Sequence, residues 1–450
     1  MSSIYYIEDI DSLRFALSVY DQYDINLLQP HFPGYPIFCF LASTIYFFTN
    51  SLAITFSIIG GLSSFFIIYF SILLTKFKGP SYEYYFLILL LLLNPMLWIM
   101  SNRYMPDLMG LSIFVASFYY LTSKDNNSKY LGGFLLGVML GVRLSYFPLL
   151  LLPVCILFFQ NNFKTNLFFI SSITLGCIIW LLPLIWITGY ENLFNLANIQ
   201  TVGHFTDFGG TFLTEDSWKN RAIYFMHTIW GDGLGGYWMG RSHVTLLLSV
   251  FLVINIFTSF NYLRTNLWNS NRLKILIISM LLYALWAFCF QNIIYKSRHV
   301  MPIVYLIILL FPYGLKSISN NKYYKSVIIL FLASLLFVST NLALQHKQPT
   351  AIAKLRDSLV NTDKHSLVIS NPLINYYLKS TGLNINFIDI DLKQVEINLN
   401  LKKNYKYIYM VGDYHSFIDE NKTISLDSVF YHNPYVNRMW STINLYKVEI

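Results

Sequence analysis

The feature that most constrains this chain is a succession of long apolar stretches between residues 35 and 343. A helix that crosses the hydrocarbon core of a bilayer needs about 20 predominantly apolar residues, and most of these stretches are that long. Charged residues make up 12% of the chain, whereas a soluble domain carries about 25%. The chain is therefore predicted to be an α-helical multi-pass integral membrane protein surrounded by membrane lipids.

The apolar stretches predict about ten transmembrane helices. Residues 35–48 are too few to cross the bilayer and are expected to form a half-inserted or interfacial helix. The stretch 130–160 contains Arg143 and Ser145 and then Pro148, so two short helices that meet at a turn are predicted there. The other predicted crossings are residues 51–74, 83–101, 106–122, 166–188, 243–260, 274–293, 300–315 and 325–343.

The positions of lysine and arginine predict which loops face the cytoplasm, because loops rich in these residues stay on that side of a membrane. They fall in alternate loops, at Lys76, Lys78, Lys124, Lys129, Lys164, Arg264, Arg272, Lys274, Lys316, Lys322 and Lys325. Residues 1–34, 189–240 and 345–450 are then expected on the periplasmic or extracytoplasmic side of a cell (inner) membrane. The net charge of +8 is spread over these loops, so no nucleic-acid partner is expected.

Two domains are predicted, with a boundary between residues 344 and 345. Residues 1–344 are expected to form the transmembrane domain, with a first extracytoplasmic loop at 1–34 and a large one at 189–240. In residues 345–450 the apolar runs are short and alternate with polar residues, which is typical of strands. A small α/β domain is predicted, with strands near 366–369, 385–390, 407–411 and 445–448 and helices at 350–361 and 372–380.

A polar, acidic segment lies near the start of the chain, with five carboxylates at Glu8, Asp9, Asp11, Asp21 and Asp24. It is followed by Gln29-Pro30-His31-Phe32-Pro33-Gly34-Tyr35-Pro36, whose three prolines and glycine favour a stiff, non-helical turn. Such a turn would hold His31 and Tyr35 at a fixed place beside the membrane. Asp11 and Arg14 are three residues apart, so on a helix they could simply pair on one face.

The pattern Asp11-x-x-Arg14-Phe15-Ala16, followed after a spacer by His31-x-Pro33-x-Tyr35-Pro36, resembles the first extracytoplasmic loop of the GT-C glycosyltransferases. These are multi-pass membrane enzymes that take a sugar from a polyprenyl-phosphate carrier, such as aminoarabinose transferases and the family 39-like protein O-mannosyltransferases. They usually carry a second acid directly after the first, where this chain has Ser12. They also usually have a transmembrane helix before this loop, so a truncated or unusually short N-terminus is expected here.

The resemblance implies a GT-C-like fold and glycosyltransferase activity on the outer face of the membrane. The donor would be a polyprenyl-phosphate sugar, the acceptor a lipid, a glycan or a protein, and Asp11 the general base. Pro106-Asp107 resembles the second acidic position of these enzymes, which makes Asp107 the second catalytic candidate. The alternative for Asp107 is a structural ion pair with Arg103, four residues earlier.

Basic residues in apolar surroundings are further candidates, because a buried guanidinium requires an anion nearby. The partner of Arg143 could be a lipid-linked phosphate or a protein carboxylate such as Asp107. Arg298-x-x-x-Pro302 also resembles a GT-C pattern, with simple interfacial anchoring as the alternative. The candidate substrate-binding residues are Glu8, Asp9, Arg14, His31, Tyr35, Arg103, Arg143, Tyr146, Lys296, Arg298 and His299.

The stretch 189–240 mixes histidines and acids, namely His204, Asp207, Glu215, Asp216, His227 and Asp232. Their spacing matches no known metal site, so no cofactor is assigned and the need for a divalent cation stays open. A substrate-gating loop is favoured instead, in which Trp230, Tyr237 and Trp238 stack on a sugar ring or lie at the membrane interface.

These residues favour a direct displacement, with Asp11 taking the acceptor's proton and Arg143 and Arg298 holding the departing polyprenyl phosphate. The alternative is a lipid or glycan transporter or flippase without transferase activity. Transporters typically show inverted repeats and broken helices at the membrane midplane, and no such repeat is evident in the sequence. A second alternative is an enzyme of the same architecture that uses a different donor or ligates whole glycans.

Overall fold

The computed structural model describes residues 3–77, 79–207, 209–214, 217–266, 270–316, 322–390, 405–414, 423–435 and 438–448. Their contacts divide the chain into two compact units. The first comprises Met1–Ser3 and Arg14–Leu344, and the second comprises Ile4–Leu13 and Gln345–Ile450. Residues 4–13, which the sequence assigned to the first loop of the transmembrane domain, thus group with the C-terminal domain.

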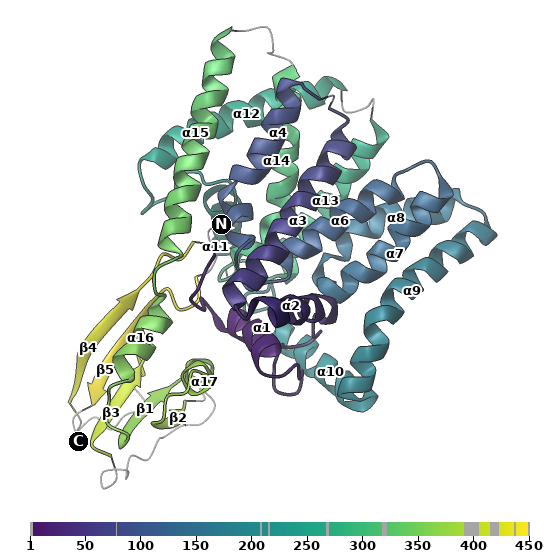
Figure 1. Cartoon of the computed structure of the whole chain (residues 1–450). Helices are drawn as coiled ribbons and strands as arrows, with labels where there is room; N and C mark the ends of the chain where they lie inside the picture. Colours follow the sequence, from purple (N-terminus) through teal and green to yellow (C-terminus); the bar gives the residue numbers. More distant parts are fainter. Residues whose placement is uncertain are drawn as a thin grey trace. The chain divides into compact units, whose positions relative to one another are not determined.

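The first unit is helical (Figure 1). Its helices are α1 (Ile10–Tyr20), which begins in the second unit, α2 (Pro36–Thr49), α3 (Leu52–Thr75), α4 (Tyr82–Leu93), α5 (Pro95–Met100), α6 (Asp107–Leu121), α7 (Asn126–Val142), α8 (Pro148–Gln160), α9 (Phe163–Thr188), α10 (Tyr190–Thr206), α11 (Trp218–His227), α12 (Val244–Asn266), α13 (Asn271–Phe290), α14 (Met301–Lys316) and α15 (Lys322–Gln345). Short helical segments are η1 (Leu144–Tyr146), the π-helix η2 (Thr228–Gly233) and η4 (Ser297–Val300).

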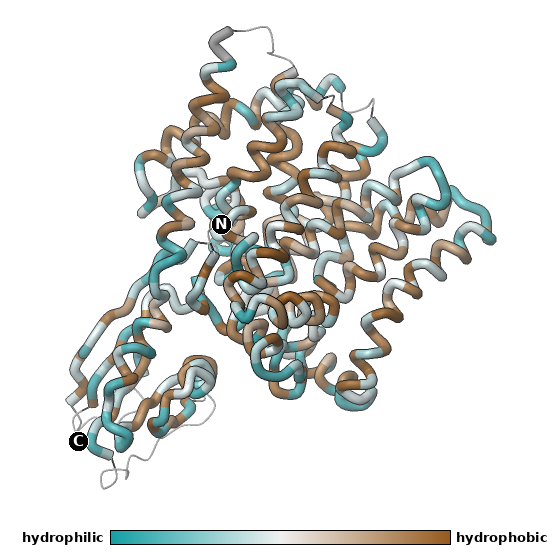
Figure 2. Tube along the Cα trace, in the orientation of Figure 1, coloured by the Kyte–Doolittle hydropathy of each residue, from teal (hydrophilic) through white to brown (hydrophobic). Residues whose placement is uncertain are grey.

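Among the described residues, six helical segments are long and apolar enough to cross a membrane. They are Leu52–Thr75, Phe163–Thr188, Val244–Asn266, Asn271–Phe290, Ser297–Leu315 and Lys325–Gln345. Shorter apolar helices are Pro36–Thr49, Tyr82–Leu93, Asp107–Leu121 and Pro148–Gln160. Apolar residues are concentrated in the middle of the helices and polar ones in many of the connections (Figure 2). The prediction of a helical multi-pass membrane protein is therefore confirmed.

Several predicted boundaries were wrong for identifiable reasons. The expected crossing at 83–101 is broken into α4 and α5, because Pro95 cannot continue a helical hydrogen-bond ladder. The Asn94 side chain then accepts a hydrogen bond from the Leu97 amide (3.0 Å) and caps α5. The stretch 189–240, expected to be a loop, contains α10, α11 and the π-helix. The predicted pair of helices within 130–160 is found, as α7 and α8.

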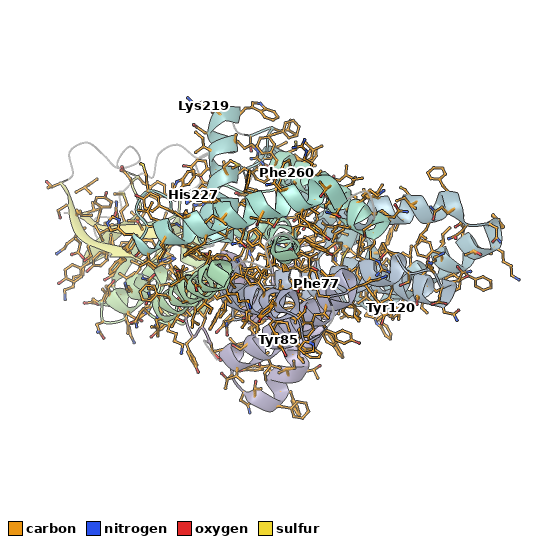
Figure 3. The ribbon with its side chains drawn as sticks, turned by 90° about the horizontal axis from the view of Figure 1, so that it is seen from above. Phe77, Tyr85, Tyr120, Lys219, His227 and Phe260 are labelled. Atoms are coloured by element: carbon orange, nitrogen blue, oxygen red, sulfur yellow. The ribbon has the colours of Figure 1, made fainter. Side chains whose placement is uncertain are left out.

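Helices α3 and α6 lie side by side and run in the same direction (Figure 1). The ring of Phe56, early in α3, stacks on Tyr104 just before α6 at 4.5 Å. Near their ends, the rings of Phe70 and Tyr119 lie 5.8 Å apart. Aromatic side chains such as Phe77, Tyr85, Tyr120 and Phe260 are spread across the view along the bundle (Figure 3). This parallel pair gives the unit two distinct ends, one at Asp107 and one beyond Tyr119.

The second unit contains a five-stranded sheet in the order β2-β1-β3-β5-β4. Its strands are β1 (Ser366–Ser370), β2 (Asn386–Asp389), β3 (Tyr407–Val411), β4 (Ile424–Tyr431) and β5 (Thr442–Val448), and its helices are α16 (Ala351–Leu359) and α17 (Pro372–Ser380). Strand β1 pairs in parallel with β2 and β3, whereas β5 pairs antiparallel with β3 and β4. The predicted α/β domain is confirmed, although β4, which is largely exposed, was not predicted.

The N-terminal residues of the second unit are held by its C-terminal part. The carboxylate of Glu8 contacts Nδ1 of His346, and both side chains are buried. The hydroxyl of Thr350 donates a hydrogen bond to the carbonyl of Ile7 (2.9 Å). A buried carboxylate and a hydrogen-bonded backbone thus tie residues 4–13 to the start of the C-terminal domain.

Candidate functional site

The centre of the candidate site in the first unit is Asp107, the first residue of α6, whose side chain is completely buried. The N-terminus of a helix stabilises a negative charge, because its free backbone N–H groups and dipole point toward it. A buried carboxylate still needs cationic partners. Two arginines supply them.

Arg143 and Arg298 approach Asp107 from different parts of the chain. Nη2 of Arg143, at the end of α7, lies 3.0 Å from Oδ1 of Asp107. Nε of Arg298, in η4, lies 3.7 Å from Oδ2. No described residue donates a geometrically well-formed hydrogen bond to either carboxylate oxygen, so charge attraction rather than hydrogen bonding joins the three groups. Of the two partners proposed for Arg143, the carboxylate is therefore present in the structure.

An aromatic group adjoins Arg143. Its Nη1 donates a hydrogen bond to Oη of Tyr35 (3.3 Å), and Oη of Tyr35 lies 3.2 Å from Nε2 of His31. The ring of Phe15, on α1, packs edge-on against Tyr35 at 5.0 Å and against His31 at 6.2 Å. Tyr35 has a positive φ of 46° and directly precedes α2. The proline-rich turn thus places Tyr35 against Arg143 and His31 against Tyr35.

His299 and two tyrosines complete the surroundings of Arg143. Nη2 of Arg143 lies 3.2 Å from Nδ1 of His299. A guanidinium can only donate, so Nδ1 must accept and the imidazole carries its proton on Nε2. The hydroxyl of Tyr283 donates to the carbonyl of His299 (2.9 Å), and the Tyr283 ring is perpendicular to that of Tyr146 at 5.6 Å. The buried Tyr146 hydroxyl has no hydrogen-bond partner among the described residues.

Gly110 makes room for this arrangement. It lies one turn after Asp107 on α6, and a Cβ atom there would lie 2.7 Å from Cβ of Arg143. Real Cβ atoms do not approach other atoms so closely. The absence of a side chain at residue 110 therefore allows the end of α7 to lie against the start of α6 and brings Arg143 to Asp107.

Of the five N-terminal acids, Glu8, Asp9 and Asp11 belong to the second unit, where two of them have structural partners. Oδ1 of Asp9 accepts a hydrogen bond from the Ser12 amide (2.7 Å), as a helix cap does for α1. Glu8 pairs with His346. Asp11 is buried in the first turn of α1. The substrate role assigned to Glu8 and Asp9 and the catalytic role assigned to Asp11 stay predictions.

The remaining candidates lie at three places. Arg14 is partly buried on α1, and Arg103 is buried in the connection before α6. Lys296 is partly buried directly before η4. Their proposed contacts with substrate stay predictions.

The aromatic and acidic residues of 189–240 are held by contacts within the first unit. Trp238 stacks on His227 at 4.6 Å, and Trp230 Nε1 donates to the carbonyl of Tyr237 (3.2 Å). Asp232, buried in the π-helix, forms an ion pair with Arg241, which the sequence did not suggest. π-Helical turns often occur at functional sites.

The other polar residues of this stretch are dispersed. Nε2 of His204 donates to the carbonyl of Phe290 (2.6 Å), and burial lowers the pKa of this histidine. Asp207 is exposed at the end of α10, and Glu215 and Asp216 lie outside the described residues. In the part of the chain that the structure describes, no group of three or more His, Cys, Asp or Glu side chains could hold a metal ion.

Sequence reasoning missed Gly110 and Tyr283. Tyr283 lies within an apolar helix, where a hydroxyl that must find a partner is a usable signal. The importance of Gly110 could not be predicted from the sequence, because glycines are common in membrane helices. Only the position of Arg143 in the structure explains why a glycine is needed at residue 110.

Comparison with known proteins identifies the fold. No protein-family model and no curated protein matches the sequence. The crystal structure of ArnT from Cupriavidus metallidurans bound to undecaprenyl phosphate is similar with a TM-score of 0.56 and 8% sequence identity, over 91% of this chain and 87% of that one. The apo structure of the same ArnT gives a TM-score of 0.50 and 10% identity, over 99% and 94% of the two chains. ArnT is an aminoarabinose transferase with the GT-C fold, so the predicted GT-C-like fold is confirmed.

Proposed function

We propose that this protein is a membrane glycosyltransferase that moves a sugar from a polyprenyl-phosphate-linked donor to a lipid, glycan or protein acceptor on the outer face of a cell membrane. The observation that carries the proposal is the buried cluster of Arg143 and Arg298 on Asp107, in a chain with the GT-C-like fold.

The donor phosphate would bind at the two arginines. Arg143 shares its carboxylate partner with Arg298, and both guanidinium groups are planar forks that match phosphate oxygens. ArnT, whose fold this chain shares, has been crystallised with undecaprenyl phosphate bound. The arginines would neutralise the charge that develops on the phosphate as it leaves, while Asp107 keeps them in place.

The transfer itself would be a single displacement. The acceptor oxygen or nitrogen forms a bond to the anomeric carbon as the bond from that carbon to the phosphate oxygen breaks. The electron pair leaves with the polyprenyl phosphate, and the acceptor's proton passes to Asp11 as general base. One such step inverts the anomeric configuration. Asp11 is proposed because Asp11-x-x-Arg14-Phe15-Ala16 resembles the first acidic motif of the GT-C glycosyltransferases.

The test is transfer by the purified full-length protein from polyprenyl-phosphate sugars to candidate acceptors, with and without a chelator. Asp11→Asn is expected to lower turnover by about 10²–10⁴-fold, the usual cost of losing a positioned general base, while thermal stability and donor binding stay near those of the wild type. Asp21→Asn is the matched control on the same acidic segment. Lipid movement across liposomes without any transfer would favour a flippase instead, and full activity of Asp11→Asn would assign the base elsewhere.

A further inference from the structure

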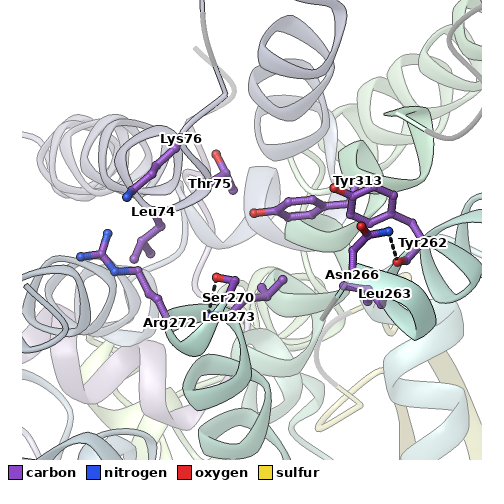
Figure 4. Close-up of a pocket in the computed structure, with 10 residues that line it drawn as sticks. All are labelled: Leu74, Thr75, Lys76, Tyr262, Leu263, Asn266, Ser270, Arg272, Leu273 and Tyr313. Atoms are coloured by element: carbon purple, nitrogen blue, oxygen red, sulfur yellow. Dashed lines mark hydrogen bonds between the residues drawn. The ribbon is translucent and has the colours of Figure 1, made fainter. Parts of the chain in front are cut away.

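A pocket lies at the end of the first unit opposite the Asp107 cluster. It has a volume of about 270 Å³, and its lining includes Lys76, Tyr262, Asn266, Ser270, Arg272 and Tyr313 (Figure 4). These residues come from the end of α3, the end of α12, the start of α13 and the later part of α14. Nothing in the proposed transfer reaction uses them.

The pocket and the Asp107 cluster are at opposite ends of α6. Nη2 of Arg272 donates a hydrogen bond to the carbonyl of Thr122 (3.0 Å), directly after α6 ends. Its guanidinium also lies 5.2 Å from the ring of Tyr119. With a rise of 1.5 Å per residue, the length of α6 separates the two places by about 20 Å.

The charges of this pocket are of one sign. Of the residues that line it, Lys76 and Arg272 are cationic and none is acidic. The ammonium and guanidinium groups lie on the same side of the pocket (Figure 4). Lys76 is exposed and Arg272 partly buried, and Arg272 is oriented by its contacts with Thr122 and Tyr119. Two cations that line one pocket without an acid make it favourable for an anion.

We propose that this pocket binds the phosphate of an anionic membrane phospholipid. The guanidinium of Arg272 offers a fork for phosphate oxygens and Lys76 a mobile second charge. The rings of Tyr262 and Tyr313 stack at 5.8 Å, and tyrosine is enriched where a membrane meets water.

The surface beside the pocket indicates that the bound phosphate belongs to a lipid. On α12, Phe257 and Phe260 are 63% and 62% exposed, less than two turns before Tyr262. This apolar surface is where the acyl chains of a bound lipid would lie. Basic pockets between transmembrane helices are known to hold anionic lipid headgroups at the cytoplasmic leaflet, the side on which the positions of Lys76 and Arg272 place this end.

The experiment titrates the purified full-length protein in detergent with phosphatidylglycerol and, separately, with phosphatidylcholine, and counts bound lipid by native mass spectrometry. The wild type is expected to retain one phosphatidylglycerol at concentrations where phosphatidylcholine has dissociated. The double variant Lys76→Gln/Arg272→Gln should weaken that binding by on the order of tenfold or more. Arg264→Gln is the control, because Arg264 is exposed on the last turn of α12 but does not line the pocket.

Arg272→Lys is the control for misfolding of the double variant. It keeps the positive charge and should retain part of the affinity for phosphatidylglycerol. A further arm adds sn-glycerol 3-phosphate and inorganic phosphate as competitors. Failure of both to displace the lipid supports a lipid site, whereas binding of these soluble anions without phosphatidylglycerol binding would overturn the lipid assignment. Equal phosphatidylglycerol affinity of the wild type and the double variant would overturn the site as a whole.

Discussion

At the scale of single residues, Arg143 is the side chain on which the candidate site depends. Its Nη1 donates to Tyr35, and its Nη2 faces both Asp107 and His299. The ammonium group of a lysine is a compact charge and cannot reproduce the contacts that the guanidinium makes with these three residues. A substitution by lysine, which keeps the positive charge, therefore tests the contacts of Arg143 separately from its charge.

Arg143→Lys is expected to lower the affinity for the polyprenyl-phosphate donor by about tenfold or more, because hydrogen bonds to charged groups contribute about 1.5–3 kcal/mol. Competition of donor binding by polyprenyl phosphate measures this, alongside thermal stability. Arg264→Lys, on an exposed helix end, is the control. Normal donor affinity with lowered stability would make Arg143 a purely structural partner of Asp107.

Exchanging Asp107 and Arg143 does not test their ion pair alone. An arginine at residue 107 would face Arg298, which now lies 3.7 Å from the Asp107 carboxylate. The exchange is therefore expected to restore only part of the stability lost in the single variants. The ion pair of Arg298 with Asp107 could not be predicted, because the two residues are far apart in the sequence.

Gly110→Ala is expected to destabilise the protein by about 1–3 kcal/mol, the usual cost of overpacking a filled site. The new methyl group would push against Cβ of Arg143, so donor affinity should fall as well. Gly61→Ala on α3 is a matched control, since nothing lies within 4 Å of a Cβ built there. That control should be neutral or slightly stabilising, as alanine favours helix more than glycine does. Equal effects at both positions would exclude close packing at Gly110 as the cause.

At the scale of helices and strands, what could be predicted followed from strong local patterns. The long apolar stretches and the break near Arg143 and Pro148 predicted the helices found there. Helix α10 was missed because its composition resembles a polar loop. Strand β4 was missed because its apolar alternation stops after Leu426, where its pairing with β5 shifts register. For the site, the turn that carries His31 and Tyr35 was predictable, whereas the meeting of α6, α7 and η4 at Asp107 depends on tertiary packing.

Helix α11 is fixed in place by one buried arginine. Arg221 is 1% exposed and donates hydrogen bonds to the carbonyls of Phe288 (2.5 Å), Gly210 (2.6 Å) and Gln291 (2.8 Å). Its guanidinium also lies 5.6 Å from the ring of Phe288. Arg221 thus joins α11, which leads into the π-helix, to the end of α13.

Arg221→Met is expected to loosen α11 without unfolding the protein, because it leaves three carbonyls, two of them buried, without their donor. Hydrogen exchange of amides in 209–233 should accelerate by at least tenfold, while exchange in the β-sheet of the second unit stays unchanged. Lys219→Met on the exposed face of the same helix is the control and should have little effect. Unchanged exchange in Arg221→Met would show that other contacts hold α11.

At the scale of the whole molecule, the chain passes between its two units three times, after residues 3, 13 and 344. The candidate base Asp11 therefore belongs to the same unit as the C-terminal sheet. The sequence assigned Asp11 and the sheet to different domains. Because Glu8 and the Ile7 carbonyl are bound by His346 and Thr350, the position of residues 4–13 depends on the C-terminal domain.

The predicted membrane topology can now be stated for each of the two units. If the positions of lysine and arginine orient the protein correctly, residues 189–240 and both parts of the second unit lie outside the cell. The connection between α6 and α7 would then lie in the cytoplasm. Single cysteines should report these sides when introduced into a protein that lacks the four native ones. Suitable exposed positions are Met239, Ser380 and Asn127.

Met239→Cys and Ser380→Cys are expected to react with a membrane-impermeant maleimide in intact cells, and Asn127→Cys only after the membrane is permeabilised. The reason is that Lys124 and Lys129 flank the third position, and moving lysines across a bilayer is costly. Labelling of all three in denatured protein controls for the reactivity of each thiol. Labelling of Ser380→Cys but not Met239→Cys in intact cells would refute a shared outer side. Labelling of Asn127→Cys alone would invert the topology and place the phospholipid pocket, rather than the Asp107 cluster, outside the cell.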